Sequence, residues 1–206
     1  LAEARARRGD AEWARTVLRQ LATGLRVLHE HDVVHRDLKP SNVLLARDES
    51  GEIVVKIADF GIARFAARSD AARQETVSPT AVTATNAALT RAGVLLGTPA
   101  YMAPELATGA SDALPSADVF AFGVIAYELL TDRYPFAQPP IHTPGVAHLA
   151  RAPLATSLPA WCASVVDGCL SMDPAQRPTA IELEALLDDR SSRAAVASSP
   201  PVRARP

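Results

Sequence analysis

Lysine and cysteine are scarce in this chain of 206 residues. Lys39 and Lys56 are the only lysines among 21 basic residues, so a lysine kept in this arginine-rich background suggests a specific role. Cys162 and Cys169 are also the only cysteines. On one helix they would lie about 10 Å apart, too far for a disulfide, and two thiols alone make no metal site. We expect reduced core cysteines and a cytoplasmic location.

The sequence also lacks a signal peptide and any apolar run of the roughly 20 residues that a bilayer crossing needs. Its most apolar stretch, residues 119–130, contains Glu128 and predicts a buried helix. With 21 basic and 23 acidic residues, the net charge of −2 argues against a nucleic-acid or membrane-surface binder. Because the first residue is Leu1 and not Met, we expect a piece of a longer sequence.

Apolar spacing predicts a mainly α-helical domain with one small β-hairpin, an α+β fold. The hairpin is indicated by short β-branched runs on either side of Gly51, which would supply the turn. Residues 66–92 are rich in Ala and Thr and predict a long surface loop, and 131–158 are Pro-rich and irregular. The first expected helix begins after the N-cap Asp10 and runs to about Glu30, and three more cover 116–130, 159–170 and 179–188. The expected strands are 43–45 and 53–57.

The residues that can carry chemistry lie at one end of this predicted hairpin. Asp37, Lys39 and Asn42 fall in the loop before the first strand, and Asp59 directly follows the second strand. A carboxylate and an amide offer the oxygen ligands that Mg²⁺ prefers. An ammonium group can balance phosphate charge, and a second carboxylate can move a proton. This set outlines a magnesium–phosphate site.

Five motifs occur along the chain: HRDLKPSN (35–42), IADFG (57–61), GTPAYMAPE (97–105), SADVFAFG (116–123) and Arg177 within DPAQRP. In this order they resemble the large C-terminal lobe of a protein kinase, of the eukaryotic-like serine/threonine type found in bacteria. The resemblance covers about residues 1–189, and leaves 190–206 as a Ser-, Pro- and Arg-rich linker expected to be disordered.

The resemblance implies transfer of the ATP γ-phosphoryl group to protein hydroxyls. Asp37 would accept or orient the proton of the substrate hydroxyl, and Lys39 would stabilise the transferred group. Thr98 would hydrogen-bond both, and Lys39 and Thr98 together imply serine/threonine specificity. The segment 97–105 would form the platform for the protein substrate.

Further roles follow from the same resemblance. Asn42 and Asp59 would hold Mg²⁺ on the nucleotide phosphates, and Leu44 and Ala58 would line the floor of the adenine pocket. The implied regulatory residues are Arg36 and Thr90, a loop residue whose phosphate Arg36 would meet. The implied structural residues are Glu105 and Arg177, a buried ion pair, and Asp118, which would anchor the catalytic loop and also cap its own helix.

Simpler interpretations exist for individual residues. Taken alone, Asp37 and Asp59 would be turn or cap residues, and Lys56 is expected to be an exposed charge on a strand. His35 and Phe60 are expected to pack in the core, and no other histidine has metal-binding spacing.

The small N-terminal lobe of a kinase has no counterpart in this sequence, which contains no G-x-G-x-x-G loop and no V-A-I-K strand. The first interpretation is a fragment of a complete kinase, since the catalytic residues are intact. The alternative is a truncated, non-catalytic lobe that binds proteins. A small-molecule phosphotransferase is disfavoured by the GTPAYMAPE segment. Expected partners are a protein substrate and ATP, without nucleic acid; a membrane anchor could follow Pro206.

Overall fold

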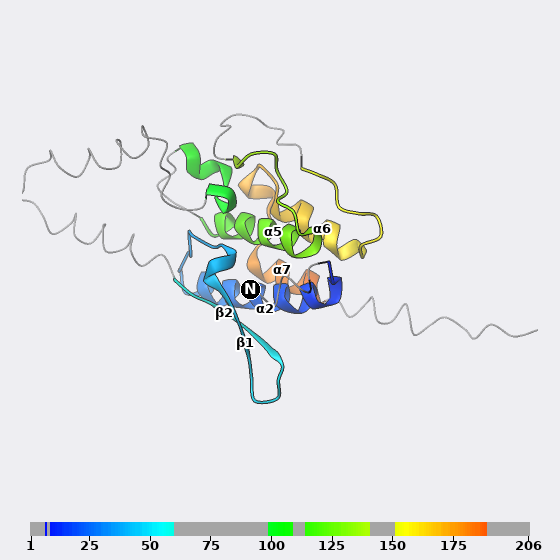
Figure 1. The fold of residues 1–206 in the computed structure, drawn as a ribbon. Coiled ribbons are helices and arrows are strands. Elements are labelled where there is room, and N and C mark those ends of the chain that lie inside the picture. The colour runs from blue at the N-terminus through cyan, green and yellow to red at the C-terminus, as the bar shows by residue number, and fades with distance from the viewer. Residues whose placement is uncertain (1–6, 8, 60–98, 109–113, 141–150, 189–206) are drawn as a thin grey trace, which may run out of the picture.

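A computed structural model describes residues 7, 9–59, 99–108, 114–140 and 151–188. Within these residues, four α-helices surround one core, and a two-stranded antiparallel sheet packs against them at its base (Figure 1). The predicted mainly helical fold with one hairpin is therefore confirmed. The elements are α2 (Ala11–Glu30), β1 (Val43–Arg47), β2 (Ile53–Ile57), α5 (Pro115–Thr131), α6 (Ala160–Cys169) and α7 (Ala180–Asp188).

Helix α2 begins and ends where its sequence predicts. The Asp10 side chain accepts a hydrogen bond from the Trp13 amide at 3.1 Å, which satisfies one of the unpaired N–H groups at the start of a helix. Its apolar stripe, including Leu18, Leu21 and Leu25, is fully buried. The helix packs chiefly against α7 and also contacts β2 and α5. It thus joins the helical core to the hairpin.

Helix α5 is apolar on every side and runs through the middle of the molecule (Figure 1). It packs most closely on α6, where only a glycine allows the approach: a Cβ at Gly123 would lie 2.5 Å from Cys169 Cβ. The prediction that Asp118 caps this helix is wrong, since the N-cap position is Leu114 and has no side-chain cap. Asp118 lies inside the first turns, and its carboxylate bonds elsewhere, as described below.

The hairpin has a regular register in which Val43 pairs with Ile57 and Arg47 with Ile53. Gly51 adopts φ +85°, a left-handed conformation that favours glycine and closes the turn as predicted. Because β1 follows the loop 35–42 and β2 precedes Asp59, both ends of the predicted site meet at the base of the hairpin.

A side chain of α2 fixes this base. The Gln20 amide donates to the Ile53 carbonyl at 2.8 Å and accepts from the Val55 amide at 2.9 Å, so it pairs with β2 as a further strand would. Gly24, one turn further along α2, lies so close to β2 that a Cβ there would be 2.8 Å from Ile57 Cδ1. The hairpin is thereby held on α2.

The remaining sequence-based predictions concern the cysteines, membrane crossing and residues that the structure does not describe. Cys162 and Cys169 are buried and free, as expected, and burial raises the pKa of the Cys162 thiol to about 11. In the described part of the chain, no helix combines the length and hydropathy needed to cross a membrane. The predicted loop 66–92, the tail 190–206, Phe60, Thr90 and Thr98 lie outside the described residues.

Candidate active site

The loop 35–42 is anchored by one buried carboxylate. Asp118 accepts from the backbone amides of His35 and Arg36, each at 2.8 Å and each on a different oxygen. Its side chain is 1% exposed. Arg36 has φ +68°, a conformation that costs a non-glycine residue free energy and therefore needs such support. The two bonds fix the backbone immediately before Asp37.

His29 is a third partner of this carboxylate, with its Nε2 2.9 Å from Asp118 Oδ2. This role of His29 was not predicted from the sequence, where His29 was weighed only as a metal ligand. A signal was present: His29 lies four residues after the buried Leu25, on the inward-facing stripe of α2. The contact connects the end of α2 to the anchor of the loop.

His35 connects the loop to the end of the hairpin. Its ring is fully buried, with Nε2 2.9 Å from the Ala58 carbonyl and Nδ1 accepting from the Asp37 amide at 3.3 Å. Since a carbonyl can only accept, this pattern assigns the ring proton to Nε2. His35 is thus a hydrogen-bonded core residue, as expected, and it holds the residues beside Asp37 and Asp59 together.

Three predicted site residues meet within the loop. The Lys39 ammonium lies 2.7 Å from Asp37 Oδ2. The Asn42 amide donates to the Asp37 carbonyl at 2.8 Å and lies 3.5 Å from its Oδ2. Asn42 is buried, whereas the Asp37 side chain is 51% exposed. The arrangement presents a fixed carboxylate to the exterior with a cation beside it.

Asp59 lies at the same end of the hairpin. The Ala58 amide donates to the Asn42 carbonyl at 2.8 Å, which places Asp59 one residue beyond this pair. Asp59 is exposed and has φ +56°, a second strained position next to the loop. Among the described residues no hydrogen bond joins the Asn42 and Asp59 side chains. The backbone bond between Ala58 and Asn42 brings the side chains of Asn42 and Asp59, which both carry oxygen, to the same end of the hairpin.

This donor set suits a magnesium ion held together with phosphates. In the described part of the chain, no group of three or more His, Cys, Asp or Glu side chains could enclose a metal. Mg²⁺ is commonly bound through one or two protein oxygens, with substrate phosphates and water as the other ligands. The exposed Asp59 carboxylate and the Asn42 side-chain amide fit that requirement, because the bond between Ala58 and Asn42 places them at one end of the hairpin.

Leu44 and Ala58 lie beside these residues on the two strand ends. Leu44 is 50% exposed, and it is paired across the hairpin with Lys56. Lys56 is exposed, as expected. Ala58 is partly buried. The hairpin therefore offers an exposed apolar side chain next to loop 35–42 and Asp59.

Segment 99–108 lies on the other side of the loop. It contains two short 3₁₀ turns, Pro99–Tyr101 and Pro104–Thr108. A small pocket separates it from the loop and from α5. The pocket is lined by Arg36, Asp37 and Leu38 of the loop, by Tyr101, Met102, Ala103 and Leu106 of the segment, and by Ala117, Asp118 and Ala121 of α5.

The far end of this segment is held by an ion pair. Arg177 donates to both Glu105 oxygens, at 2.7 and 2.8 Å, and also to the carbonyls of Ser116 and Ser171. The Arg177 side chain is fully buried, whereas that of Glu105 is 24% exposed. The pair expected from the sequence is therefore present, and it joins the segment to α5 and to the region before α7.

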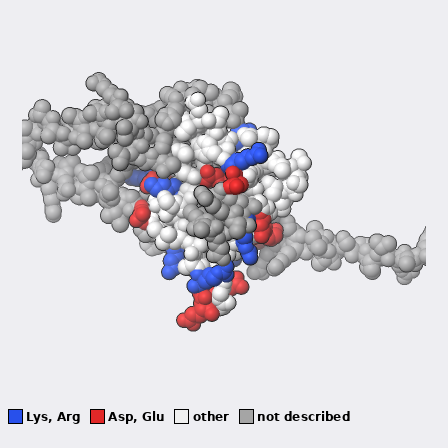
Figure 2. Space-filling model, in the orientation of Figure 1, with Lys and Arg blue, Asp and Glu red and all other residues white. Residues whose placement is uncertain are grey.

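Charge is mixed over the viewed face of the molecule. Figure 2 shows acidic and basic side chains interspersed, with acidic ones at the tip of the hairpin. That tip carries Asp48 and Glu49. Among the described residues on this face, basic side chains do not gather into one extended patch.

Comparison with known families identifies the fold. A sequence model described as the protein kinase domain matches residues 4–186. The chain belongs to the protein kinase family. The match spans all five motifs quoted above, from loop 35–42 to Arg177.

Curated bacterial relatives are named as serine/threonine-protein kinases. Pkn1 of Myxococcus xanthus is 41% identical over 138 residues, which cover 67% of this chain and 17% of Pkn1. The kinase drp72 of Corynebacterium efficiens is 36% identical over 168 residues, or 81% of this chain and 28% of drp72. PknA of Mycobacterium tuberculosis is 34% identical over 197 residues, or 92% of this chain and 40% of PknA. The chain spans well under half the length of each.

Proposed function

We propose that this chain is the large C-terminal lobe of a serine/threonine protein kinase that transfers the γ-phosphoryl group of ATP to protein hydroxyls. Residues 1–189 would form the lobe and 190–206 a linker. The observation that carries the proposal is the cluster of Asp37, Lys39 and Asn42 on a loop whose backbone is fixed by Asp118. A strained, anchored loop that presents an exposed carboxylate is typical of a catalytic position.

In the proposed reaction, a new bond forms between the substrate hydroxyl oxygen and the γ-phosphorus. The bond from this phosphorus to the β–γ bridging oxygen breaks, and ADP leaves. Asp37 accepts the hydroxyl proton, and its half-exposed position leaves room for a protein substrate. Lys39, 2.7 Å from Asp37, balances the charge of the transferred group. Thr98 is proposed to hydrogen-bond both residues.

Asn42 and Asp59 are proposed to bind Mg²⁺, and Leu44 and Ala58 to contact the adenine ring. Bound Mg²⁺ would neutralise charge on the nucleotide phosphates. The exposed apolar side chain of Leu44 supports its part in this assignment.

Regulation is proposed to act through Arg36 and a phosphate on Thr90. The Arg36 backbone is already held by Asp118, next to Asp37, so a phosphate bound by its side chain would act directly on the catalytic loop. A cytoplasmic location is proposed because both cysteines are free.

The test is autophosphorylation by the natural protein that contains these residues, measured with γ-labelled ATP and Mg²⁺. Asp37→Asn keeps the shape of the side chain but removes the proton acceptor, and we expect at least a hundredfold loss of transfer. Unchanged binding of a fluorescent ATP analogue would show that the loss concerns transfer.

The matched control is Asp32→Asn. Asp32 is exposed and has φ +56°, a conformation that asparagine also tolerates, and it precedes the loop. Transfer by this variant should equal that of the wild type. Transfer retained by Asp37→Asn would overturn the role proposed for Asp37. A wild-type protein that transfers no phosphate would overturn the proposed function and favour a protein-binding role.

A further inference from the structure

Tyr134, in the turn after α5, bonds to the backbone of segment 99–105. Its hydroxyl donates to the Ala100 carbonyl at 2.6 Å, across 34 positions of sequence. The tyrosine is partly buried. Burial, and secondarily the nearby Glu128 carboxylate, raise the pKa of Tyr134, so the hydroxyl remains a proton donor at neutral pH. The contact fixes one backbone carbonyl at the start of the segment.

The same tyrosine begins a stack of aromatic rings that leads to the other end of the segment. Tyr134 meets Phe136 edge to face, with ring centroids 5.9 Å apart and planes at 71°. Phe136 stacks on Phe120 of α5, with centroids 6.0 Å apart. The Arg177 guanidinium lies 4.9 Å from the Phe120 centroid and binds Glu105. One continuous set of contacts therefore holds the segment at Ala100 and at Glu105.

A second hydroxyl lies between these two points. Tyr101 donates to Glu128 Oε2 of α5 at 2.7 Å, and the same Glu128 acts on the pKa of Tyr134. Residues 101–103 in turn line the pocket shared with Asp37. The position of the segment relative to the catalytic loop thus depends on side chains of α5 and of the turn that follows it.

We propose that Tyr134 is a positioning residue for the protein substrate: its bond to the Ala100 carbonyl sets the place of segment 99–105 beside Asp37. This rests on the proposed function, in which the segment is the substrate platform. The hydroxyl touches neither Asp37 nor the hairpin residues assigned to ATP. Its loss therefore acts on the binding of the protein acceptor and leaves nucleotide binding unchanged.

Tyr134→Phe removes only the hydroxyl and keeps the ring in the stack. In the natural protein, with myelin basic protein as acceptor, we expect KM for the acceptor to rise about three- to tenfold, the range set by one net hydrogen bond. KM for ATP should stay constant, and kcat should change by less than about twofold. Amide hydrogen exchange in residues 99–103 should become faster.

Tyr127→Phe is the matched control, because it removes a hydroxyl from α5 itself. Among the described residues Tyr127 has no hydrogen bond to segment 99–105. The acceptor KM of the Tyr127→Phe variant should therefore equal the wild-type value. Equal acceptor KM for Tyr134→Phe and wild type, or a parallel rise in KM for ATP, would overturn the inference. A wild-type protein that transfers no phosphate to itself or to the acceptor would instead overturn the proposed function, and this inference with it.

Discussion

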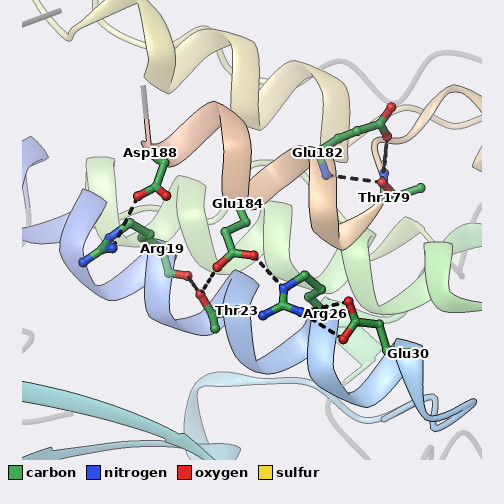
Figure 3. Close-up of polar contacts among 8 residues, drawn as sticks. All are labelled: Arg19, Thr23, Arg26, Glu30, Thr179, Glu182, Glu184 and Asp188. Atoms are coloured by element: carbon green, nitrogen blue, oxygen red, sulfur yellow. Dashed lines mark hydrogen bonds and ion pairs between the residues drawn. The ribbon is translucent and has the colours of Figure 1, made fainter. Parts of the chain in front are cut away.

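The anchor of loop 35–42 and the interface between α2 and α7 both consist of charged side chains and hydrogen bonds, but they differ in burial. At the anchor, one carboxylate that is 1% exposed receives two backbone amides and His29. At the interface, partly buried and exposed bonds are spread along two facing helices (Figure 3).

The interface bonds form a row along the two helices. Glu184 of α7 accepts from the Thr23 hydroxyl at 2.7 Å and from Arg26 Nε at 2.7 Å, and Arg26 also pairs with Glu30. The bond between Arg19 and Asp188 is more exposed, with side chains 48% and 58% accessible. At the start of α7, Thr179 and Glu182 bond to each other's backbone, the reciprocal cap of a Thr-x-x-Glu sequence.

The comparison shows that the number of polar bonds is a poor measure of their weight. Exposed ion pairs contribute about 0–1 kcal/mol, because water and salt compete for both partners. A buried acceptor that is lost leaves amides without water or protein partners, which costs about 1–3 kcal/mol for each group. A few bonds at the anchor should therefore outweigh the whole row at the interface.

Asp118→Asn should have the largest effect. One of the two amides would face an NH₂ group in place of an oxygen, and both would lose a charged acceptor. We expect a loss of about 3 kcal/mol in the free energy of unfolding and at least tenfold slower phosphoryl transfer. Urea unfolding and the autophosphorylation assay measure the two effects. A loss below about 1 kcal/mol would remove the distinction between the two regions.

Glu105→Gln tests a pair of intermediate burial, with Arg177 fully buried and Glu105 24% exposed. The amide keeps one acceptor oxygen, but the guanidinium loses its counter-charge. We expect about 2 kcal/mol of destabilisation, below the 3–5 kcal/mol typical of a fully buried pair, because water reaches Glu105. Urea unfolding of this variant and of Asp118→Asn shows which of the two loses more free energy of unfolding. Equal losses would show that the partial exposure of Glu105 has no effect on stability.

Local sequence signals predicted the elements well because each signal acts within a few residues. The cap at Asp10, the turn at Gly51 and the spacing of Leu18, Leu21 and Leu25 were each confirmed at their predicted places. The motif spacing also grouped Asp37, Lys39 and Asn42 in one loop. The proximity of Asp59 required only the pairing of two adjacent strands.

Contacts between distant segments were harder to predict. Local reasoning assigned Asp118 as a cap, whereas only the resemblance led to its bonds with His35 and Arg36, more than 80 positions away. His29 and Tyr134 were not predicted as site residues. The spacing of α2 indicates only that His29 faces inward. The partners of both residues depend on how α2 and the turn after α5 pack against distant segments, which local spacing does not specify.

Glu184→Gln should have the smallest effect in this series. Bonds from Thr23 and then Arg26 lower the pKa of Glu184 below its ordinary value of 4.5. Its contribution to stability is therefore complete above the unfolded-state pKa and is lost as pH falls through the lower folded-state pKa. We expect about 0.5 kcal/mol of destabilisation at pH 7 and low salt, and less in 1 M NaCl. The difference in stability from wild type should narrow as the pH falls below the unfolded-state pKa. Asp188→Asn, at the exposed bond to Arg19, is the control and should lose less free energy of unfolding at pH 7. A loss near 3 kcal/mol for Glu184→Gln would mean that the partly exposed bonds between α2 and α7 act as one cooperative unit. Burial alone would then not separate the two regions.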